Sequence, residues 1–103
     1  MQAEENILEN EVCEAEVSIK NAEGLHMRPA MQFVDIATRF KCEVTVSNRE
    51  NEVDGKSIMQ MSMLAATCGT KLKIRAEGPD AGKAVEALRH LVEERMFDEP
   101  PPA

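Results

Sequence analysis

Hydrophobic and polar residues alternate along three short segments of the chain, at residues 12–20, 42–47 and 72–77. A period of two places successive side chains on opposite faces of an extended strand, so each segment is expected to bury one face. The turn-forming letters SNREN follow the second segment, and a short fourth strand is predicted at 51–54, paired with it as a hairpin. Four strands are therefore expected.

Helical spacing of apolar residues fills the gaps between these strands. One stripe consists of Ala30, Phe33, Val34, Ala37 and Phe40, and a longer one of Ala81, Ala84, Val85, Leu88, Leu91, Val92 and Met96. Apolar residues three and four positions apart predict amphipathic helices. Asp80 is expected to cap the second of these helices. A third helix is predicted to begin near Ser57 and to use Gly69 as the residue that follows its end.

The predicted order is strand, helix, strand, strand, helix, strand, helix. Strands that alternate in polarity bury one face only, which favours an α+β fold: an antiparallel four-stranded sheet with the helices on one face. The folded domain is expected to span residues 12–96. The acidic residues 1–11 and the proline-rich residues 97–103 are expected to be frayed extensions.

Charge and composition narrow the possible functions. The net charge is −7 over 103 residues, so the summed field repels nucleic acids and anionic membranes, and neither is an expected partner. No segment approaches the roughly 18 apolar residues of a membrane span, and a cytoplasmic protein is the expectation. Cys13, Cys42 and Cys68 lack the spacing of a zinc site and are predicted to be free thiols, most simply buried ones.

The stretch AEGLHMRPAMQF places a histidine at the start of the first helix. Gly24 can supply a turn, Pro29 is tolerated in a first helical turn, and His26 falls at or near the N-cap. The positive end of the helix dipole and the nearby Arg28 disfavour a protonated ring. A neutral ring nitrogen is a nucleophile, and a phosphoryl group on it would find backbone N–H donors and a guanidinium within reach.

Other roles for His26 are open on the sequence alone. The side chain can simply cap the helix. A metal site is not expected, because no acidic or cysteine cluster accompanies His26 in the sequence and the second histidine, His90, is predicted to face solvent. A hydrolase of the serine–histidine–aspartate type is also not expected, since such a site needs a buried acid and a pocket.

The stretch VDGKSIMQMSMLAA contains a second predicted helix N-terminus whose free N–H groups could bind an anion, at Ser57. This serine is an N-cap type, and phosphorylation would add about −1.5 to −2 charge where free N–H groups tolerate it. Ile58, Met59, Met61, Met63 and Leu64 are spread too widely around a helix for all of them to be buried. Part of this set is expected to form an adaptable surface for a partner, although core filling by a short helix is an alternative.

Three motifs together resemble one family. GLHMRPA, then GKSIM with its serine 31 residues after the histidine, then AEGPDAGKAVEAL are similar to the histidine-containing phosphocarrier proteins, HPr, of the bacterial sugar phosphotransferase system. The resemblance covers about residues 14–95. It implies an HPr-like open-faced β-sandwich, βαββαβα, with sheet order 1-4-2-3 and three helices on one face.

The resemblance also implies roles. His26 would take a phosphoryl group from phosphorylated enzyme I and pass it to enzyme IIA proteins, with Arg28 supporting transfer and Pro29 shaping the helix start. The chain would be a monomeric carrier rather than an independent catalyst, with no cofactor and no metal. Met27 would add contact area for partners. Glu23 departs from the family, which commonly has a small polar residue there, and its carboxylate is expected to oppose a phosphate on the ring.

Ser57 matches a serine that an HPr kinase/phosphorylase modifies in some bacteria, and Lys56, Ile58 and Met59 match the positions that flank it. Met61 is expected to join the same partner surface. The alternative function is a regulatory HPr-like module, a target of HPr kinase or part of a nitrogen-type phosphorelay, without sugar transport. A purely structural domain would leave unexplained why His26 and Ser57 each stand at a helix N-terminus that can bind an anion.

Overall fold

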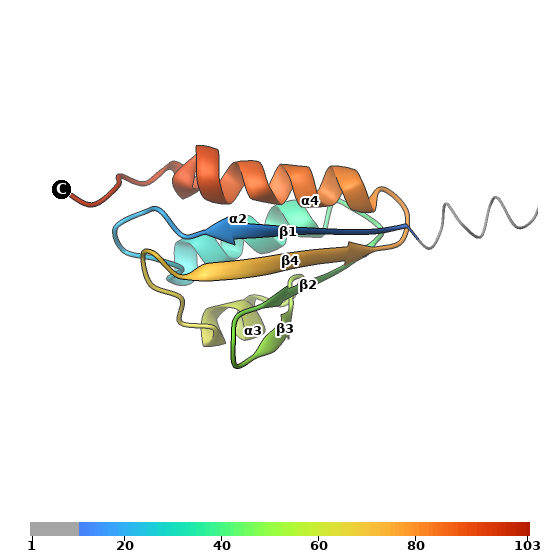
Figure 1. Ribbon diagram of the computed structural model, residues 1–103, viewed down its shortest axis with the longest axis horizontal. Helices are drawn as coiled ribbons and strands as arrows, with labels where there is room; N and C mark the ends of the chain where they lie inside the picture. The colour runs from blue at the N-terminus through green and yellow to red at the C-terminus, as the bar shows by residue number, and fades with distance from the viewer. Residues whose placement is uncertain (1–10) are drawn as a thin grey trace, which may run out of the picture.

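Four strands form one antiparallel sheet, and the helices lie on one of its faces (Figure 1). The computed structural model describes residues 11–103. The strands are β1 (Val12–Ser18), β2 (Glu43–Ser47), β3 (Glu52–Asp54) and β4 (Lys71–Glu77), and their order across the sheet is β1-β4-β2-β3. All three neighbouring pairs are antiparallel. The predicted fold class, strand order and strand positions are confirmed.

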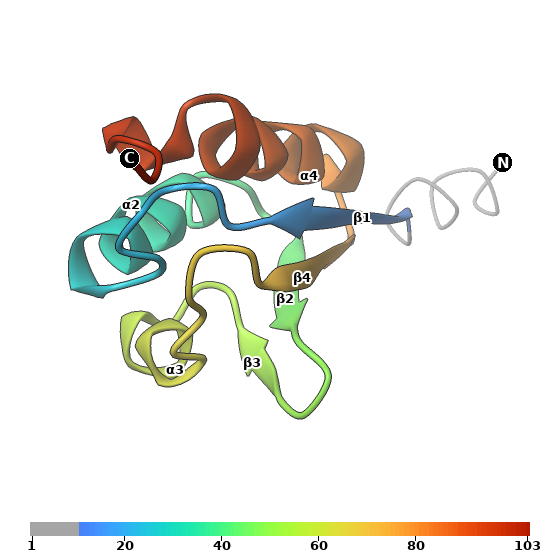
Figure 2. The same cartoon turned by 60° about the vertical axis from the view of Figure 1, so that its left-hand side comes forward.

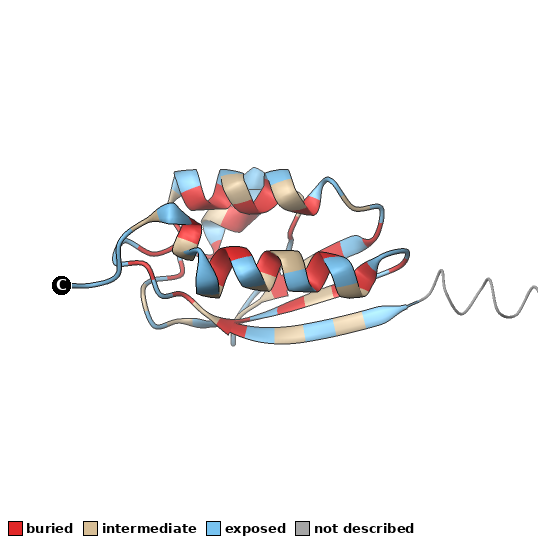
Figure 3. Cartoon of the chain, turned by 90° about the horizontal axis from the view of Figure 1, so that it is seen from above, coloured by how far each residue is buried: buried red, intermediate tan, exposed pale blue. Residues whose placement is uncertain are grey.

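The helices are α2 (Met27–Ala37), α3 (Ile58–Met63) and α4 (Ala81–Arg89). Figure 3 shows α2 and α4 side by side, each with a buried stripe, while buried or half-buried positions alternate with exposed ones along β1. The predicted apolar stripes are confirmed from Ala30 to Ala37 and from Ala81 to Val92, whereas Phe40 and Met96 at their ends are only half-buried and lie outside these helices. The core between the helices and the sheet contains Phe33 of α2, Ile74 of β4 and Leu88 of α4, all fully buried.

Local hydrogen bonds explain the hairpin between β2 and β3. The Asn48 side-chain oxygen accepts the N–H groups of Glu50 and Asn51, at 2.8 and 2.7 Å, and the Asn48 N–H donates to the Asn51 carbonyl. An asparagine that bonds its own backbone two and three residues ahead stabilises a tight turn. The hairpin predicted from SNREN is confirmed.

One predicted helix boundary, the end of α3, is wrong. Helix α3 ends at Met63, and Ala65 already has a left-handed φ of 49°. Gly69 instead lies in the turn that leads into β4, where its N–H donates to the Ile19 carbonyl at 2.7 Å. Asp80 is the N-cap residue of α4, as predicted, but its backbone is left-handed and its side chain makes no capping hydrogen bond. The six-residue α3 was too short for periodicity to fix its end.

The last helix changes its winding before it ends. After α4 the chain makes a π-helical turn, His90–Glu94 (η1), and then a short 3₁₀ turn, Met96–Asp98 (η2). A π turn accommodates one additional residue relative to an α-helix. The buried position therefore passes from the predicted Met96 to Phe97, which is fully buried in the core, whereas Met96 is half-buried.

The prediction that the chain frays beyond residue 96 is wrong for Phe97 to Pro100. Phe97 belongs to the core cluster, and the Pro100 carbonyl accepts the Ala22 N–H at 3.0 Å. Figure 2 shows this C-terminal segment against the loop between β1 and α2. At the other end, residues 1–10 of the predicted acidic extension lie outside the described residues.

Candidate functional site

His26 stands at the N-cap of α2. Its backbone is extended, with φ −85° and ψ −170°, and its carbonyl accepts the first helical bond from Ala30 at 3.0 Å. The predicted position is confirmed. The alternative that the imidazole simply caps the helix is wrong, because the His26 side chain makes no capping hydrogen bond. The ring is 39% exposed and can be approached from solvent.

Gly24 gives the loop before His26 its shape. Its φ is +73°, and a Cβ at this position would lie 2.6 Å from the Ala66 carbonyl oxygen. That same oxygen accepts the Leu25 N–H at 2.8 Å. The loop is thereby fixed against the segment that follows α3, and the positive φ predicted for Gly24 is confirmed.

The His26 ring contacts a carboxylate from the other end of the chain. Its Nε2 lies 2.8 Å from Oε2 and 3.1 Å from Oε1 of Glu99. The Glu99 side chain is only 10% exposed, so this hydrogen bond is better shielded from water than the His26 side chain, which is 39% exposed. The expectation that no acidic cluster accompanies His26 is therefore wrong. No local pattern indicated the contact with Glu99, since the two residues are 73 positions apart.

A fully buried amide holds this carboxylate in place. The Asn21 Nδ2 donates to Oε1 of Glu99 at 2.9 Å and to the Gly24 carbonyl at 2.8 Å. One side chain thus connects the histidine loop to the C-terminal segment. The Ala22 N–H, donating to Pro100, adds a second connection. Sequence reasoning missed Asn21, which follows the predicted first strand and resembles an ordinary loop residue.

The backbone of the C-terminal segment is unusual. Met96, Phe97 and Asp98 have φ values of 51°, 54° and 59°, a left-handed conformation that residues other than glycine seldom adopt. Such conformations persist when surrounding contacts fix them. Here the buried Phe97 ring and the hydrogen bonds made by Glu99 and Pro100 are the contacts that fix this turn.

Arg28 and Pro29 occupy the first turn of α2, as predicted. Pro29 is buried, while Arg28 is exposed and makes no ion pair with residues 11–103. The pKa of Asp98 is lowered, chiefly by its hydrogen bond from Arg95, with smaller contributions from the charges of Arg95 and Arg28. The Arg28 guanidinium therefore lies near the same C-terminal segment that contacts His26.

Glu23 completes an acidic cluster. Each of Glu23, His26 and Glu99 has one potential metal-ligand atom, and these three atoms lie within 4.8 Å of one another. An imidazole nitrogen with two carboxylates is a donor set that divalent cations accept. Nε2, however, is already bonded to Glu99, and nothing else in the described range points to an ion at this position. The departure at Glu23 therefore places a second carboxylate beside the ring.

Ser57 is the N-cap of α3, as predicted. Its Oγ accepts the Gln60 N–H at 3.2 Å, and the side chain is half-buried. Lys56 does not extend freely toward solvent. Its ammonium donates to the Phe40 carbonyl at 2.6 Å, just beyond the end of α2, where a cation stabilises the exposed carbonyls.

Exposed apolar side chains gather on α2 and α3, which pack against each other. They are Met27 and Met31 on α2 and Ile58, Met59 and Met63 on α3, with Met59 75% and Met63 71% exposed. The expectation of a partly exposed methionine set is confirmed. The assignment of Met61 to a partner surface is wrong, since Met61 is fully buried in the core. Met63 belongs to the set that was expected to be partly exposed, whereas Met31 was not predicted as a contact residue.

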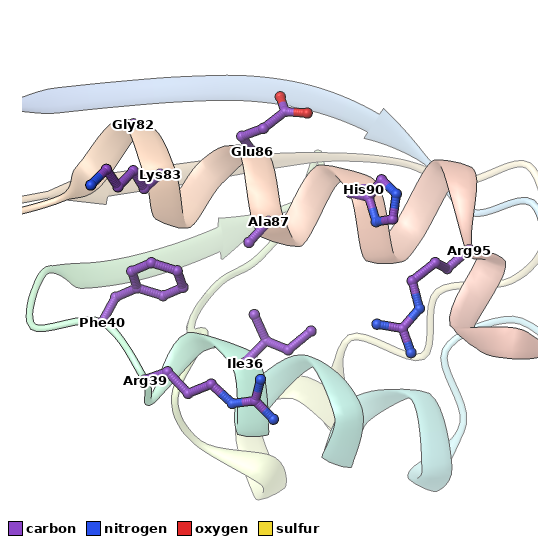
Figure 4. A pocket seen from close by; sticks show the side chains of 9 residues that line it. All are labelled: Ile36, Arg39, Phe40, Gly82, Lys83, Glu86, Ala87, His90 and Arg95. Atoms are coloured by element: carbon purple, nitrogen blue, oxygen red, sulfur yellow. The ribbon is translucent and has the colours of Figure 1, made fainter.

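A groove between α2 and α4 lies apart from His26 (Figure 4). Its apolar floor includes Ile36 and Phe40, and its rim carries charged side chains. Two of the rim cations are already paired within the chain, Arg39 with Asp35 and Arg95 with Asp98, both at 2.7 Å. His90 lies at this rim and is exposed, as predicted. The groove therefore offers little unpaired charge to a ligand.

Comparisons with known proteins indicate the same family. A family model described as PTS HPr component phosphorylation site matches residues 13–94. The phosphocarrier protein HPr of Pseudomonas aeruginosa is 48% identical over 85 residues, which are 82% of this chain and 93% of that protein. The resemblance predicted from GLHMRPA and GKSIM is confirmed.

Solved structures agree with this similarity. An HPr crystal structure from Thermoanaerobacter tengcongensis superposes with a TM-score of 0.80 at 39% identity, over 84% of this chain and 97% of that one. One from Bacillus anthracis gives 0.77 at 36% identity, over 82% and 100%. None of the helices in the described range is long and apolar enough to cross a membrane.

Proposed function

The chain belongs to the family of HPr phosphocarrier proteins of the phosphotransferase system, and we propose that it accepts a phosphoryl group from phosphorylated enzyme I on His26 and passes it to enzyme IIA proteins. The observation that carries this proposal is the position of a half-exposed imidazole at the N-cap of α2 with no capping bond of its own. A phosphoryl group on this ring meets the positive end of the helix dipole.

Arg28 and the exposed methionines support the proposal. Arg28 is an exposed cation two residues after His26, free to bind phosphoryl oxygens. Met27 on α2, with Ile58 and Met59 on α3, forms an apolar surface near that helix start, suited to transient contact with several partners. The chemistry suits a carrier, since the partners supply the rest of the geometry. A monomer in the cytoplasm without a cofactor stays a prediction.

The test is phosphoryl labelling. Incubation with phosphoenolpyruvate and purified enzyme I is expected to add one acid-labile phosphoryl group, seen as a mass increase that disappears in His26→Ala. His90→Ala is the matched control, because His90 is the other histidine of the sequence and is exposed at the start of η1, outside the contacts of His26. Labelling that persists in His26→Ala, or is lost in His90→Ala, would refute the assignment.

A second candidate function is regulation through Ser57. The favouring observation is that Ser57 caps α3 directly beside the exposed Ile58 and Met59. A phosphate there would place charge next to the apolar surface proposed for enzyme I. Incubation with ATP and an HPr kinase is expected to give an acid-stable phosphoryl group, absent from Ser57→Ala and present in Ser62→Ala. An acid-stable group that survives in Ser57→Ala would refute this role.

A further inference from the structure

The contact between Glu99 and His26 determines which ring nitrogen carries hydrogen. A deprotonated carboxylate can only accept a hydrogen bond, so the 2.8 Å contact requires a hydrogen on Nε2. In a neutral imidazole the lone pair then lies on Nδ1, the ring nitrogen next to the carbon that carries the side chain. The Glu99 contact thus selects one tautomer of the two.

We propose that Glu99 is a positioning residue for phosphoryl transfer, holding His26 as the Nε2–H tautomer with Nδ1 as the nucleophile and balancing the positive charge that forms on the ring. This inference rests on the proposed function for the transfer itself. It assigns a role to Glu99, which lies outside the GLHMRPA motif and beyond residues 13–94, the range that the family model matches.

The electron balance of the step shows why a carboxylate helps. The Nδ1 lone pair forms the new P–N bond, while the P–N bond to the donor histidine of enzyme I breaks and its electron pair returns to the donor nitrogen. Nε2 keeps its hydrogen, so the His26 ring gains a positive charge as the phosphoryl group arrives. A carboxylate already bonded to Nε2–H stabilises that charge without reorganising.

Burial and anchoring make this carboxylate preorganised. Glu99 is 10% exposed against 39% for the ring, and the fully buried Asn21 fixes its Oε1 from the opposite side. Phe97 is buried in the core, and the left-handed turn at residues 96–98 orients the chain so that the Glu99 side chain lies beside the His26 ring. Glu23 lies in the same cluster but is exposed, so water screens its charge more strongly.

Arg28 and Asp98 are the other charged groups beside this site. Unlike Glu99, neither of them makes a hydrogen bond to the His26 ring. Asp98 is exposed and hydrogen-bonded by Arg95 at 2.7 Å. Arg28 contributes to the field at Asp98 rather than pairing with Glu99. Among residues 11–103, only Glu99 makes a hydrogen bond to the His26 ring.

The first experiment measures the tautomer directly. The ¹⁵N chemical shifts of the His26 ring are recorded at about pH 8, above the ordinary histidine range, for wild type, Glu99→Gln and Glu99→Ala. Wild type and Glu99→Gln, whose amide oxygen still accepts, are expected to show Nε2–H. Glu99→Ala is expected to gain a substantial Nδ1–H population. An unchanged tautomer in Glu99→Ala would overturn the proposal, and this arm requires no enzyme I.

The second experiment measures transfer from phosphorylated enzyme I by rapid quench. Glu99→Gln is expected to react about tenfold more slowly, the effect of losing one charge-assisted hydrogen bond to the developing charge. Glu43→Gln is the control, since Glu43 is an exposed carboxylate at the start of β2 and its loss changes the net charge equally. Thermal unfolding of each variant establishes that it is folded.

The outcomes separate the two proposals. A wild type that enzyme I does not label refutes the proposed function, while the ¹⁵N shifts still decide whether Glu99 sets the tautomer. A labelled wild type with Glu99→Gln equally fast refutes the charge-balancing role of Glu99 and leaves the proposed function intact. A faster Glu99→Gln would mean that the carboxylate obstructs the ring, and would also overturn the inference.

Discussion

Nε2 of His26 and the carboxylate of Glu99 meet at 2.8 Å although 73 positions of chain separate the two residues. The contact joins the loop after the first strand to the segment after the last helix. Both ends of the fold therefore contribute to the surroundings of the proposed phosphoryl acceptor. Predictions about this site must accordingly include residues far outside the GLHMRPA motif.

Phe97 is expected to hold the C-terminal segment on the domain. Its ring is fully buried, so Phe97→Ala should lower the free energy of unfolding by about 3–5 kcal/mol. Urea denaturation measures this loss. Met63→Ala removes a large apolar side chain that is 71% exposed and should cost less than about 0.5 kcal/mol. Equal effects of the two substitutions would contradict the burial of Phe97.

Gly24 and Gly69 offer a matched pair of substitutions. Both have positive φ, +73° and +93°, so alanine strains the backbone at each position. Only at Gly24 would the new Cβ lie 2.6 Å from a carbonyl oxygen; at Gly69 no atom of the described chain lies within 4 Å. Gly69→Ala should cost about 1–3 kcal/mol, and Gly24→Ala clearly more. Thermal unfolding checks the order, and a smaller loss for Gly24→Ala would be inconsistent with the close approach.

Alanine substitutions at Met59 and Met61 should have different effects, one on binding to enzyme I and the other on the free energy of unfolding. Met61→Ala opens a cavity in the core and should cost about 2–5 kcal/mol of unfolding free energy. Met59→Ala should leave stability within about 0.5 kcal/mol, because its side chain is 75% exposed, but should weaken binding to enzyme I. Calorimetric titration with enzyme I measures the second effect. If Met59→Ala binds as tightly as wild type, Met59 is not part of the partner surface.

Acid should abolish the ion pair between Asp98 and Arg95. The pKa of Asp98 is lowered in the folded protein, chiefly by its hydrogen bond from Arg95. Its stabilising contribution is therefore complete above the unfolded pKa, about 3.9, and is lost as pH falls through the lower folded value. Because the pair is exposed, the effect should be small.

The measurement is the difference in melting temperature between wild type and Asp98→Asn as a function of pH. Wild type should be the more stable protein near neutral pH, and the two curves should converge as pH falls below the ordinary aspartate range. A difference that stays constant across this range would show that Asp98 stabilises the turn through something other than its charge.

The sheet and the main helices follow from local patterns. Alternation in residues 12–20 and the stripe through Phe33 and Ala37 reflect one buried face, which periodicity detects directly. The positions of His26, Arg28 and Ser57 were also local, since each is set by the start of its own helix. Met61 was misassigned because six residues of α3 make too few turns to distinguish the buried face from the exposed one.

Glu99 could not be predicted because its position depends on several non-local conditions at once. The π turn at 90–94 must shift the register, Phe97 must enter the core, and Asn21 must reach across from the histidine loop. None of these conditions produces a hydrophobic periodicity that could be recognised in the sequence. A tail rich in acidic residues and proline ordinarily predicts fraying, and here the burial of Phe97 and the hydrogen bonds of Glu99 and Pro100 override that tendency.

The extra residue in the π turn also bears on how such a site can change over generations. One residue rotates the following chain by about 100° around a helix axis. Deleting a single codon within His90–Glu94 would therefore turn Phe97 and Glu99 away from their present positions without altering any residue of the GLHMRPA motif. Loss of one codon in this turn would thus be enough to remove the carboxylate from beside the histidine.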